Sequence, residues 1–232
     1  MTSIKKEVTL FLIPFAGGNK YSFNCFKNLF AKNIIFSPLE LPGRGMRIHE
    51  PLKFNIDDLV SDLYLQVKEQ LDKPYAFYGH SMGSIVVYLL TKKIMSEGHA
   101  HPVHLFLSGR AGPSSTDKTQ RYLLPKSEFR NELLQLGGMT DDMINDEALM
   151  DFFEPILRAD FQVIETYQYK FSPPMNIPFT VFMGTSDRAS LEEVGFWQKE
   201  TIMPITLHQF SGGHFFIYDY SKLIADIVSQ AL

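Results

Sequence analysis

The sequence predicts an α/β fold in which a mostly parallel central sheet is flanked by helices. Short continuous apolar runs recur along the chain, which is the pattern of strands buried on both faces. Helical patterns separate these runs, and strands that alternate with helices form parallel sheets with right-handed crossovers. The length of 232 residues and the apolar content of 45% fit one domain, spanning residues 1–232, with a sizeable core.

The expected strands and helices follow from these runs and from the periodicity between them. Residues 56–71 place apolar side chains at a period close to 3.6, and Asp57 and Asp58 suit the first turn of a helix. A helix over 85–95 is expected to end at Gly98. In chain order, the expected strands are 8–13, 34–39, 75–78, 103–107, 179–183 and 205–210, and a last helix is expected over 215–232.

One connection is much longer than the others. About 70 residues separate the strand ending near Ser108 from the strand beginning near Phe179, whereas a whole βαβ unit needs ~30 residues. Helical patterns at 126–136 and 146–169 lie on either side of a Gly137-Gly138-Met139 break. We predict a helical lid inserted at about 113–172, because an unstructured loop of this size is uncommon unless it is functional. Two ordinary crossover helices with a long loop are the alternative.

Composition and charge exclude several classes of protein. The net charge of −4 gives no basic footprint for nucleic acid or an anionic membrane, and no apolar run approaches the ~18–20 residues that span a bilayer. The single cysteine, Cys25, excludes an intrachain disulfide and a cysteine zinc cluster. The N-terminus has no pattern of a signal peptide. We therefore expect a cytoplasmic protein, and a monomer because nothing predicts a coiled coil or a long edge strand.

The segment Gly79-His80-Ser81-Met82-Gly83 matches G-x-S-x-G, the nucleophile elbow of α/β-hydrolases. The match is informative because it lies between an apolar strand and an apolar helix. The sharp turn presents the Ser81 hydroxyl at a helix N-terminus, where N–H groups favour negative charge. A glycine-rich turn with a capping serine is the alternative.

A serine needs a base and an acid, which α/β-hydrolases place after it in the order acid, then histidine. His214 follows Ser211-Gly212-Gly213, directly after the last expected strand, and we predict that it is the base. Asp187 lies in the loop after the strand at 179–183 and would orient the imidazole. An N-cap role for Asp187 in a helix over 191–201 is the alternative. For His80, packing is the better interpretation, because the elbow aims its side chain away from the site.

An oxyanion hole requires two backbone N–H donors. The first expected donor is Met82, the residue after the nucleophile. The second should come from the loop 14–18, where Gly17 and Gly18 allow close approach to a ligand, and we choose Ala16, with Phe15 as the less favoured donor.

The chain resembles the type II (external, editing) thioesterases that accompany nonribosomal peptide and polyketide synthetases. The matching segments fall in the family's order across nearly the whole chain, although Arg188-Ala189 stands where the family more usually has a proline or a small apolar residue. These segments are PFAGG (14–18), LPGRGMRIHEP (41–51), YGHSMGS (78–84), LSGRAGP (107–113), LRADFQVIETYQY (157–169), GTSD (184–187) and GGHFF (212–216).

The resemblance implies an α/β-hydrolase fold with a mobile helical lid and a Ser81–His214–Asp187 triad. It also implies hydrolysis of acyl and aminoacyl thioesters on the phosphopantetheine arm of acyl or peptidyl carrier proteins, which are the expected partners. Neither a metal nor a cofactor is expected. A medium-chain fatty-acyl carrier thioesterase and a general carboxylesterase are alternatives with the same triad. A non-catalytic carrier-binding protein is a third, although an intact triad argues against it.

Two further groups of residues are open to more than one interpretation. Arg44, Arg47 and Arg110 follow expected strands at the edge of the sheet that carries the elbow. They could contact an acidic carrier protein or its phosphate, or they could form structural salt bridges. Phenylalanines in the insertion, at 152, 153 and 161, could line an acyl channel, although packing of their helix is the favoured interpretation.

Overall fold

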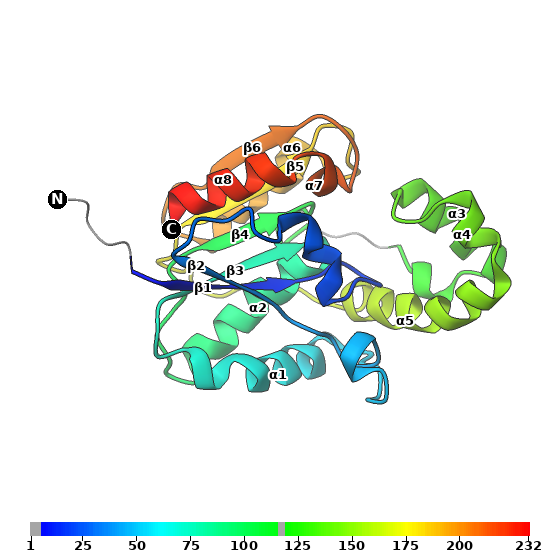
Figure 1. The fold of residues 1–232 in the computed structure, drawn as a ribbon, viewed down its shortest axis with the longest axis horizontal. Helices are drawn as coiled ribbons and strands as arrows, with labels where there is room; N and C mark the ends of the chain where they lie inside the picture. The colour runs from blue at the N-terminus through cyan, green and yellow to red at the C-terminus, as the bar shows by residue number, and fades with distance from the viewer. Residues whose placement is uncertain (1–5, 116–118) are drawn as a thin grey trace.

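The computed structural model describes residues 6–115 and 119–232, which form a parallel six-stranded sheet with helices on both faces (Figure 1). The expected α/β class is confirmed, and every expected strand is present. The strands are β1 Val8–Ile13, β2 Ile34–Pro38, β3 Tyr75–His80, β4 Leu105–Ser108, β5 Phe179–Gly184 and β6 Thr206–Phe210. They lie in the order β2-β1-β3-β4-β5-β6, so β3, which leads into the elbow, is near the middle of the sheet.

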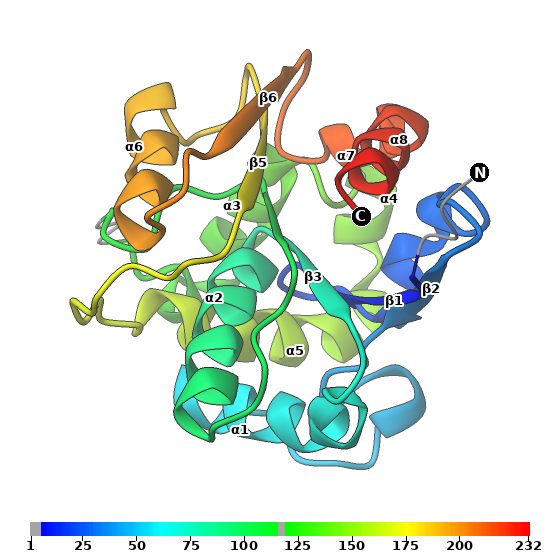
Figure 2. The same ribbon diagram turned by 90° about the vertical axis from the view of Figure 1, so that its left-hand side faces the viewer.

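Alternating side chains of the central strands build two separate cores. Phe11 and Phe77 belong to the larger cluster, which includes buried residues of α1 and α2, whereas Leu10 and Ala76 belong to a second cluster with α8. Figure 2 shows α1 and α2 together on one side of the sheet and α8 on the other. The helices are α1 Ile56–Val67, α2 Met82–Ser96, α3 Lys126–Leu136, α4 Asp141–Asn145, α5 Glu147–Glu165, α6 Leu191–Gly195, α7 Phe216–Asp219 and α8 Ser221–Ala231.

Several helix boundaries differ from the expected ones. α2 begins at Met82, directly after Ser81, so the helix starts within the sharp turn that follows β3. The helix expected over 215–232 is two helices, α7 and α8, separated at Tyr220. The helix expected over 56–71 ends as an α-helix at Val67 and continues as a 3₁₀ turn. Among the described residues, no helix combines the length and apolar character that crossing a bilayer requires.

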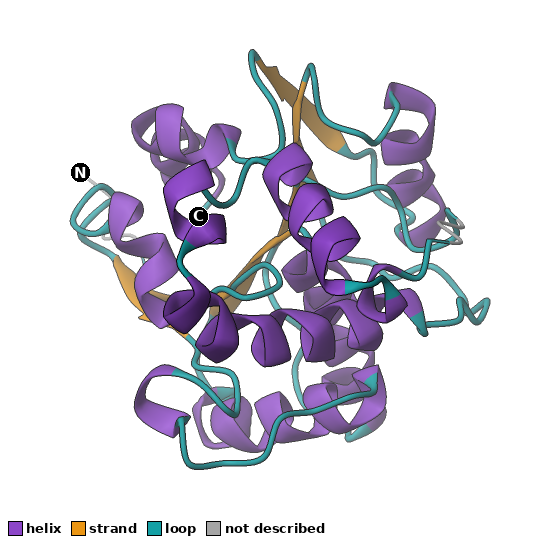
Figure 3. Cartoon of the chain, turned by 90° about the vertical axis from the view of Figure 1, so that its right-hand side faces the viewer, coloured by secondary structure: helices purple, strands orange, loops and turns teal. Residues whose placement is uncertain are grey.

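The long connection between β4 and β5 carries α3, α4 and α5. Figure 1 shows α3 and α4 standing away from the sheet, with α5 running back to it, and in Figure 3 the insertion lies in front of the sheet, toward the viewer. Phe129, Leu133, Ile144 and Met150 form a small hydrophobic cluster within this insertion, which Leu157 and Phe161 of α5 join. Farther along α5, Val163 and Ile164 pack into the main core. The insertion thus has a core of its own and is joined to the sheet through α5, an arrangement in keeping with the predicted lid.

Candidate active site

Ser81 occupies a strained turn between β3 and α2. Its backbone has φ 56 and ψ −118, a conformation that non-glycine residues rarely adopt. A Cβ at Gly79 would lie 2.3 Å from the carbonyl oxygen of Gly83, and a Cβ at Gly83 would lie 2.2 Å from that of Ile13. Both positions therefore require glycine, as the elbow interpretation predicts. The strain holds the Ser81 hydroxyl at the N-terminus of α2.

His214 and Asp187 come together because the loops after β5 and β6 are neighbours. The His214 Nδ1 lies 3.0 Å from each carboxylate oxygen of Asp187. The loops are joined by backbone hydrogen bonds from Thr185 to Phe210 and from Ser186 to Gly212. The Asp187 side chain is only 5% exposed. Its carboxylate also accepts the backbone N–H of Arg188 at 2.7 Å, a contact that helps to hold the carboxylate in place.

Asp187 is not the N-cap of the following helix. Ser190 caps α6, where its side chain accepts the N–H of Glu193 and completes a capping box with the Glu193 carboxylate. The alternative role considered for Asp187 is therefore wrong, and its carboxylate is directed at His214.

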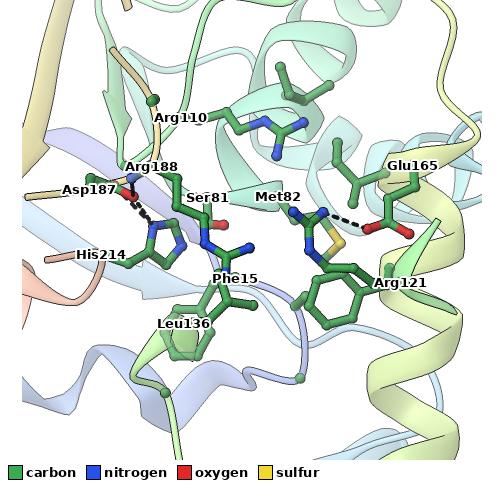
Figure 4. Close-up of a pocket in the computed structure, with 18 of the residues that line it drawn as sticks. Phe15, Ser81, Met82, Arg110, Arg121, Leu136, Glu165, Asp187, Arg188 and His214 are labelled. Atoms are coloured by element: carbon green, nitrogen blue, oxygen red, sulfur yellow. Dashed lines mark hydrogen bonds and ion pairs between the residues drawn. The ribbon is translucent and has the colours of Figure 1, made fainter. Parts of the chain in front are cut away.

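Figure 4 shows Ser81 between His214 and Met82, facing the same space. No hydrogen bond joins the Ser81 hydroxyl to His214 within residues 6–115 and 119–232. Unliganded serine hydrolases often have a loose contact here that tightens around substrate. The structure therefore brings together the three side chains expected to form a triad, with the acid and base already paired.

The backbone N–H groups near Ser81 differ in their availability. In the loop 14–18, the Gly17 N–H is donated to Asp160 at 2.7 Å and the Gly18 N–H to the Phe15 carbonyl at 2.9 Å. Over the described ranges, no hydrogen bond is donated by the N–H of Ala16, Phe15 or Met82. Ala16 and Met82, the two expected donors, both line the cavity at Ser81.

His80 packs beneath the site, as its sequence context suggests. Its ring is fully buried, its Nδ1 lies 2.9 Å from the Ser108 hydroxyl, and its ring centroid is 5.1 Å from that of His214. Burial, followed by the nearby charge of His214, holds the pKa of His80 well below its usual value. An imidazole that resists protonation is a poor general base, which leaves His214 as the expected base for Ser81.

The site opens into a cavity of about 680 Å³ that the insertion covers. Phe153 and Phe161 line this cavity, whereas Phe152 does not and is 52% exposed. The favoured packing interpretation therefore holds only in part, since Phe161 both packs in the insertion core and faces the cavity. The other apolar lining residues from the insertion are Leu133, Leu136, Met139, Met143, Leu157 and Ile164.

Charged side chains also line the cavity, and no motif in the sequence predicted most of them. Arg121 donates to Glu165 at 2.8 Å, a pair that Figure 4 shows beside Met82. Arg188 donates to Glu132 of α3 at 2.9 Å and so joins the acid loop to the insertion. Arg110, one of the three arginines left open, also faces the cavity.

The other two arginines form ion pairs within the protein. Arg47 binds Asp62 with both terminal nitrogens, each at 2.7 Å, and also pairs with Glu50. Arg44 is buried against Asp160. The salt-bridge interpretation fits both residues better than carrier contact. Within the described residues, no group of three or more His, Cys, Asp or Glu side chains could hold a metal ion.

Comparison with known proteins is consistent with this geometry. A family model described as a thioesterase domain matches residues 8–232. The gramicidin S biosynthesis protein GrsT of Aneurinibacillus migulanus is 34% identical over 228 residues, covering 97% of this chain and 89% of that protein. The crystal structure of ClbQ from the colibactin NRPS/PKS pathway has a TM-score of 0.92 at 31% identity, with 97% of both chains covered. The medium-chain S-acyl fatty acid synthase thioesterase of Homo sapiens is 29% identical over 239 residues, covering 97% of this chain and 88% of the human protein.

Proposed function

This chain belongs to the thioesterase family, and we propose that it hydrolyses acyl and aminoacyl thioesters on the phosphopantetheine arm of carrier proteins. In this role it would clear stalled or misprimed groups from a nonribosomal peptide or polyketide synthetase. The observation that carries the proposal is Ser81 in its elbow beside the His214–Asp187 pair, at a cavity covered by the insertion. The similarity to GrsT and ClbQ supports the synthetase context.

The proposed reaction has two steps. His214 takes the proton of the Ser81 hydroxyl as its oxygen attacks the thioester carbonyl, and the N–H groups of Met82 and Ala16 bind the oxyanion. The tetrahedral intermediate expels the pantetheine thiolate, which takes the proton from His214 and leaves an acyl-enzyme. Water then gives a proton to His214, attacks the acyl group and releases the acid, and the proton returns to Ser81.

Asp187 keeps the Nδ1 proton of His214 in place throughout the cycle. The 3.0 Å contacts to both carboxylate oxygens select the tautomer whose Nε2 is free to accept a proton, and they stabilise the imidazolium. A thioester needs little activation of its leaving group, so we propose that the enzyme uses no metal or cofactor besides the phosphopantetheine on the substrate. Carrier proteins are the proposed partners. The cytoplasmic location and monomeric state expected from the sequence remain predictions.

The test is intact-protein mass spectrometry of an acylated carrier. A phosphopantetheinylated carrier is loaded in turn with acetyl, aminoacyl and octanoyl groups, and its mass is followed after the enzyme is added. We expect rapid loss of short acyl and aminoacyl groups, abolished by Ser81→Ala and unaffected by Ser96→Ala, a serine on the exposed end of α2. Preferential loss of octanoyl would favour a medium-chain fatty-acyl thioesterase. Cleavage of a p-nitrophenyl ester with survival of every acyl carrier would favour a general esterase and contradict the proposal.

A further inference from the structure

The loop 14–18, which carries the proposed oxyanion donor Ala16, rests on a buried ion pair that has no place in the reaction. Arg44 follows β2, and Asp160 lies on α5. The Arg44 Nη1 contacts the Asp160 Oδ2 at 2.5 Å, and Nη2 contacts Oδ1 at 2.8 Å. The side chains are 5% and 4% exposed. A two-point contact between a guanidinium and a carboxylate fixes the relative orientation of both groups.

Both members of this pair bind the backbone directly after Ala16. The Asp160 Oδ2 accepts the Gly17 N–H at 2.7 Å, and the Arg44 Nη1 donates to the Gly18 carbonyl at 3.3 Å. The loop also lies close to α5, because a Cβ at Gly17 would be 2.4 Å from the Leu157 Cδ2. The ion pair therefore holds the 16–17 peptide unit through the Gly17 N–H and the 18–19 peptide unit through the Gly18 carbonyl.

These contacts restrict the direction in which the N–H of the preceding residue, Ala16, can point. Because Asp160 takes the Gly17 N–H and the Phe15 carbonyl takes the Gly18 N–H, neither group can turn toward a ligand while those bonds persist. Among the described residues the Ala16 N–H donates no hydrogen bond, and Ala16 lines the same cavity as Ser81. An oxyanion donor is effective only if it is held in position before the charge develops.

A contribution to stability alone is a weak explanation for this pair. Burying two charges costs several kcal/mol per ion, and apolar replacements of a buried ion pair are often neutral or stabilising. An apolar pair, however, could not accept the Gly17 N–H or donate to the Gly18 carbonyl. The directional contacts are what the ion pair supplies to this loop.

We infer that Arg44 and Asp160 are positioning residues that hold the loop 14–18 so that the Ala16 N–H points to the oxyanion formed at Ser81. The inference rests on the proposed function only in that Ser81 attacks an ester or thioester carbonyl. It connects two sequence segments whose roles are otherwise unassigned, the LPGRG stretch and the LRADF stretch. It also means that one residue holding the loop 14–18, Asp160, lies on α5, the helix through which the insertion joins the sheet.

The test compares Asp160→Asn and Arg44→Lys with Asp62→Asn. The control breaks another two-point pair, Arg47–Asp62, which is less buried and touches no residue of the loop 14–18. The kcat and KM are measured with p-nitrophenyl acetate and with an acetylated carrier, and the folded fraction is measured by urea unfolding. Hydrogen exchange of the Gly17 amide is followed by NMR, which requires no substrate.

We expect the kcat of Asp160→Asn to fall roughly 10- to 100-fold, with KM changed less than about threefold, because a misplaced donor acts on the transition state. The Gly17 amide should exchange at least about tenfold faster, since its acceptor is weakened. Arg44→Lys keeps the charge but loses the two-point contact, so it should show the lower kcat and the faster Gly17 exchange to a smaller degree. If Asp160→Asn does not fold, Arg44→Lys tests the inference in its place. Asp62→Asn should leave kcat and the Gly17 exchange unchanged.

Two results would overturn the inference. One is a folded Asp160→Asn or Arg44→Lys whose kcat matches that of Asp62→Asn, or whose activity falls only in proportion to its folded fraction. The other is a Gly17 amide that exchanges at the wild-type rate in folded Asp160→Asn. That result counts against the inference even if no substrate is turned over. Failure of the proposed function looks different, because the wild-type protein would then cleave the p-nitrophenyl ester and spare the acyl carrier.

Discussion

The His214 imidazole meets Asp187 with its Nδ1 at 3.0 Å from both carboxylate oxygens, across 27 residues of sequence. The contact exists because β5 and β6 are parallel neighbours whose following loops lie at one edge of the sheet. Ser81 reaches that same edge at the end of β3. The strand arrangement therefore brings Asp187 and His214, the expected acid and base, into direct contact at the edge of the sheet where Ser81 lies.

Replacing Asp187 by asparagine should remove most of the activity while keeping the fold. The amide would favour the wrong imidazole tautomer and could not stabilise the imidazolium, so we expect kcat to fall roughly 10³- to 10⁴-fold. Steady-state kinetics with a thioester substrate provides the measurement. Glu192→Gln is the control, because Glu192 is an exposed carboxylate on the next helix and should keep its rate. A kcat for Asp187→Asn within tenfold of wild type would remove Asp187 from the triad.

The two adjacent phenylalanines of α5 should differ in their effect on acyl-chain selection. Phe153 lines the cavity and Phe152 is exposed to solvent. Phe153→Ala removes apolar contact from a bound chain, so kcat/KM for an octanoyl substrate should fall roughly tenfold, with less change for acetyl. Phe152→Ala should leave both values unchanged. Equal effects from the two substitutions would mean that the acyl chain lies elsewhere.

Alanine at Gly83 should disrupt the elbow. The new Cβ would lie 2.2 Å from the Ile13 carbonyl oxygen, which is backbone and cannot move aside cheaply. We expect a loss of about 3 kcal/mol in the free energy of unfolding, measured by urea denaturation. Gly195→Ala is the matched control, since nothing lies within 4 Å of its Cβ position and its φ is −60. A fully stable Gly83→Ala would contradict the close approach of α2 to β1.

The half-buried imidazole of His104 should make stability depend on pH. Burial lowers its pKa from 6.5 to about 4, and its ring stacks on Phe106 with the Nε2 at 2.8 Å from the Thr180 hydroxyl. Between these two pKa values the unfolded chain binds a proton that the folded protein does not, so stability is lost as pH falls from 6.5 toward 4. We expect the wild-type protein to lose about 1–2 kcal/mol more than His104→Gln between pH 7 and pH 5.

Urea unfolding of both proteins at the two pH values measures this difference. His80, which is also held neutral by burial, is present in both proteins, so its contribution cancels in the comparison. Identical pH dependence of the two proteins would mean that His104 takes up protons as readily in the folded state as in the unfolded state.

Much of the fold and the candidate site could be predicted because the signals are local. The strand over 8–13 appears within its expected limits, since its six residues, five of them apolar, are buried on both faces of the sheet. The helix over 126–136 also matches, and its end coincides with Gly137 in a left-handed conformation. The predicted helix boundaries were wrong where a turn sets the end of the helix. α2 starts within the elbow, at Met82, and the last predicted helix is divided at Tyr220.

The sequence by itself determined the nucleophile turn and the order of the triad candidates, because both depend on which residues follow which strand. Only the tertiary structure decided what surrounds them. Arg44 and Asp160 are 116 residues apart, and neither carries a local mark that it binds the other or the loop 14–18. The same holds for the ion pair between Arg188 and Glu132. It also holds for the position of Phe153, which lines the cavity although the adjacent Phe152 does not. Such contacts depend on how distant segments pack in space, and a pattern read along one chain does not contain that geometry.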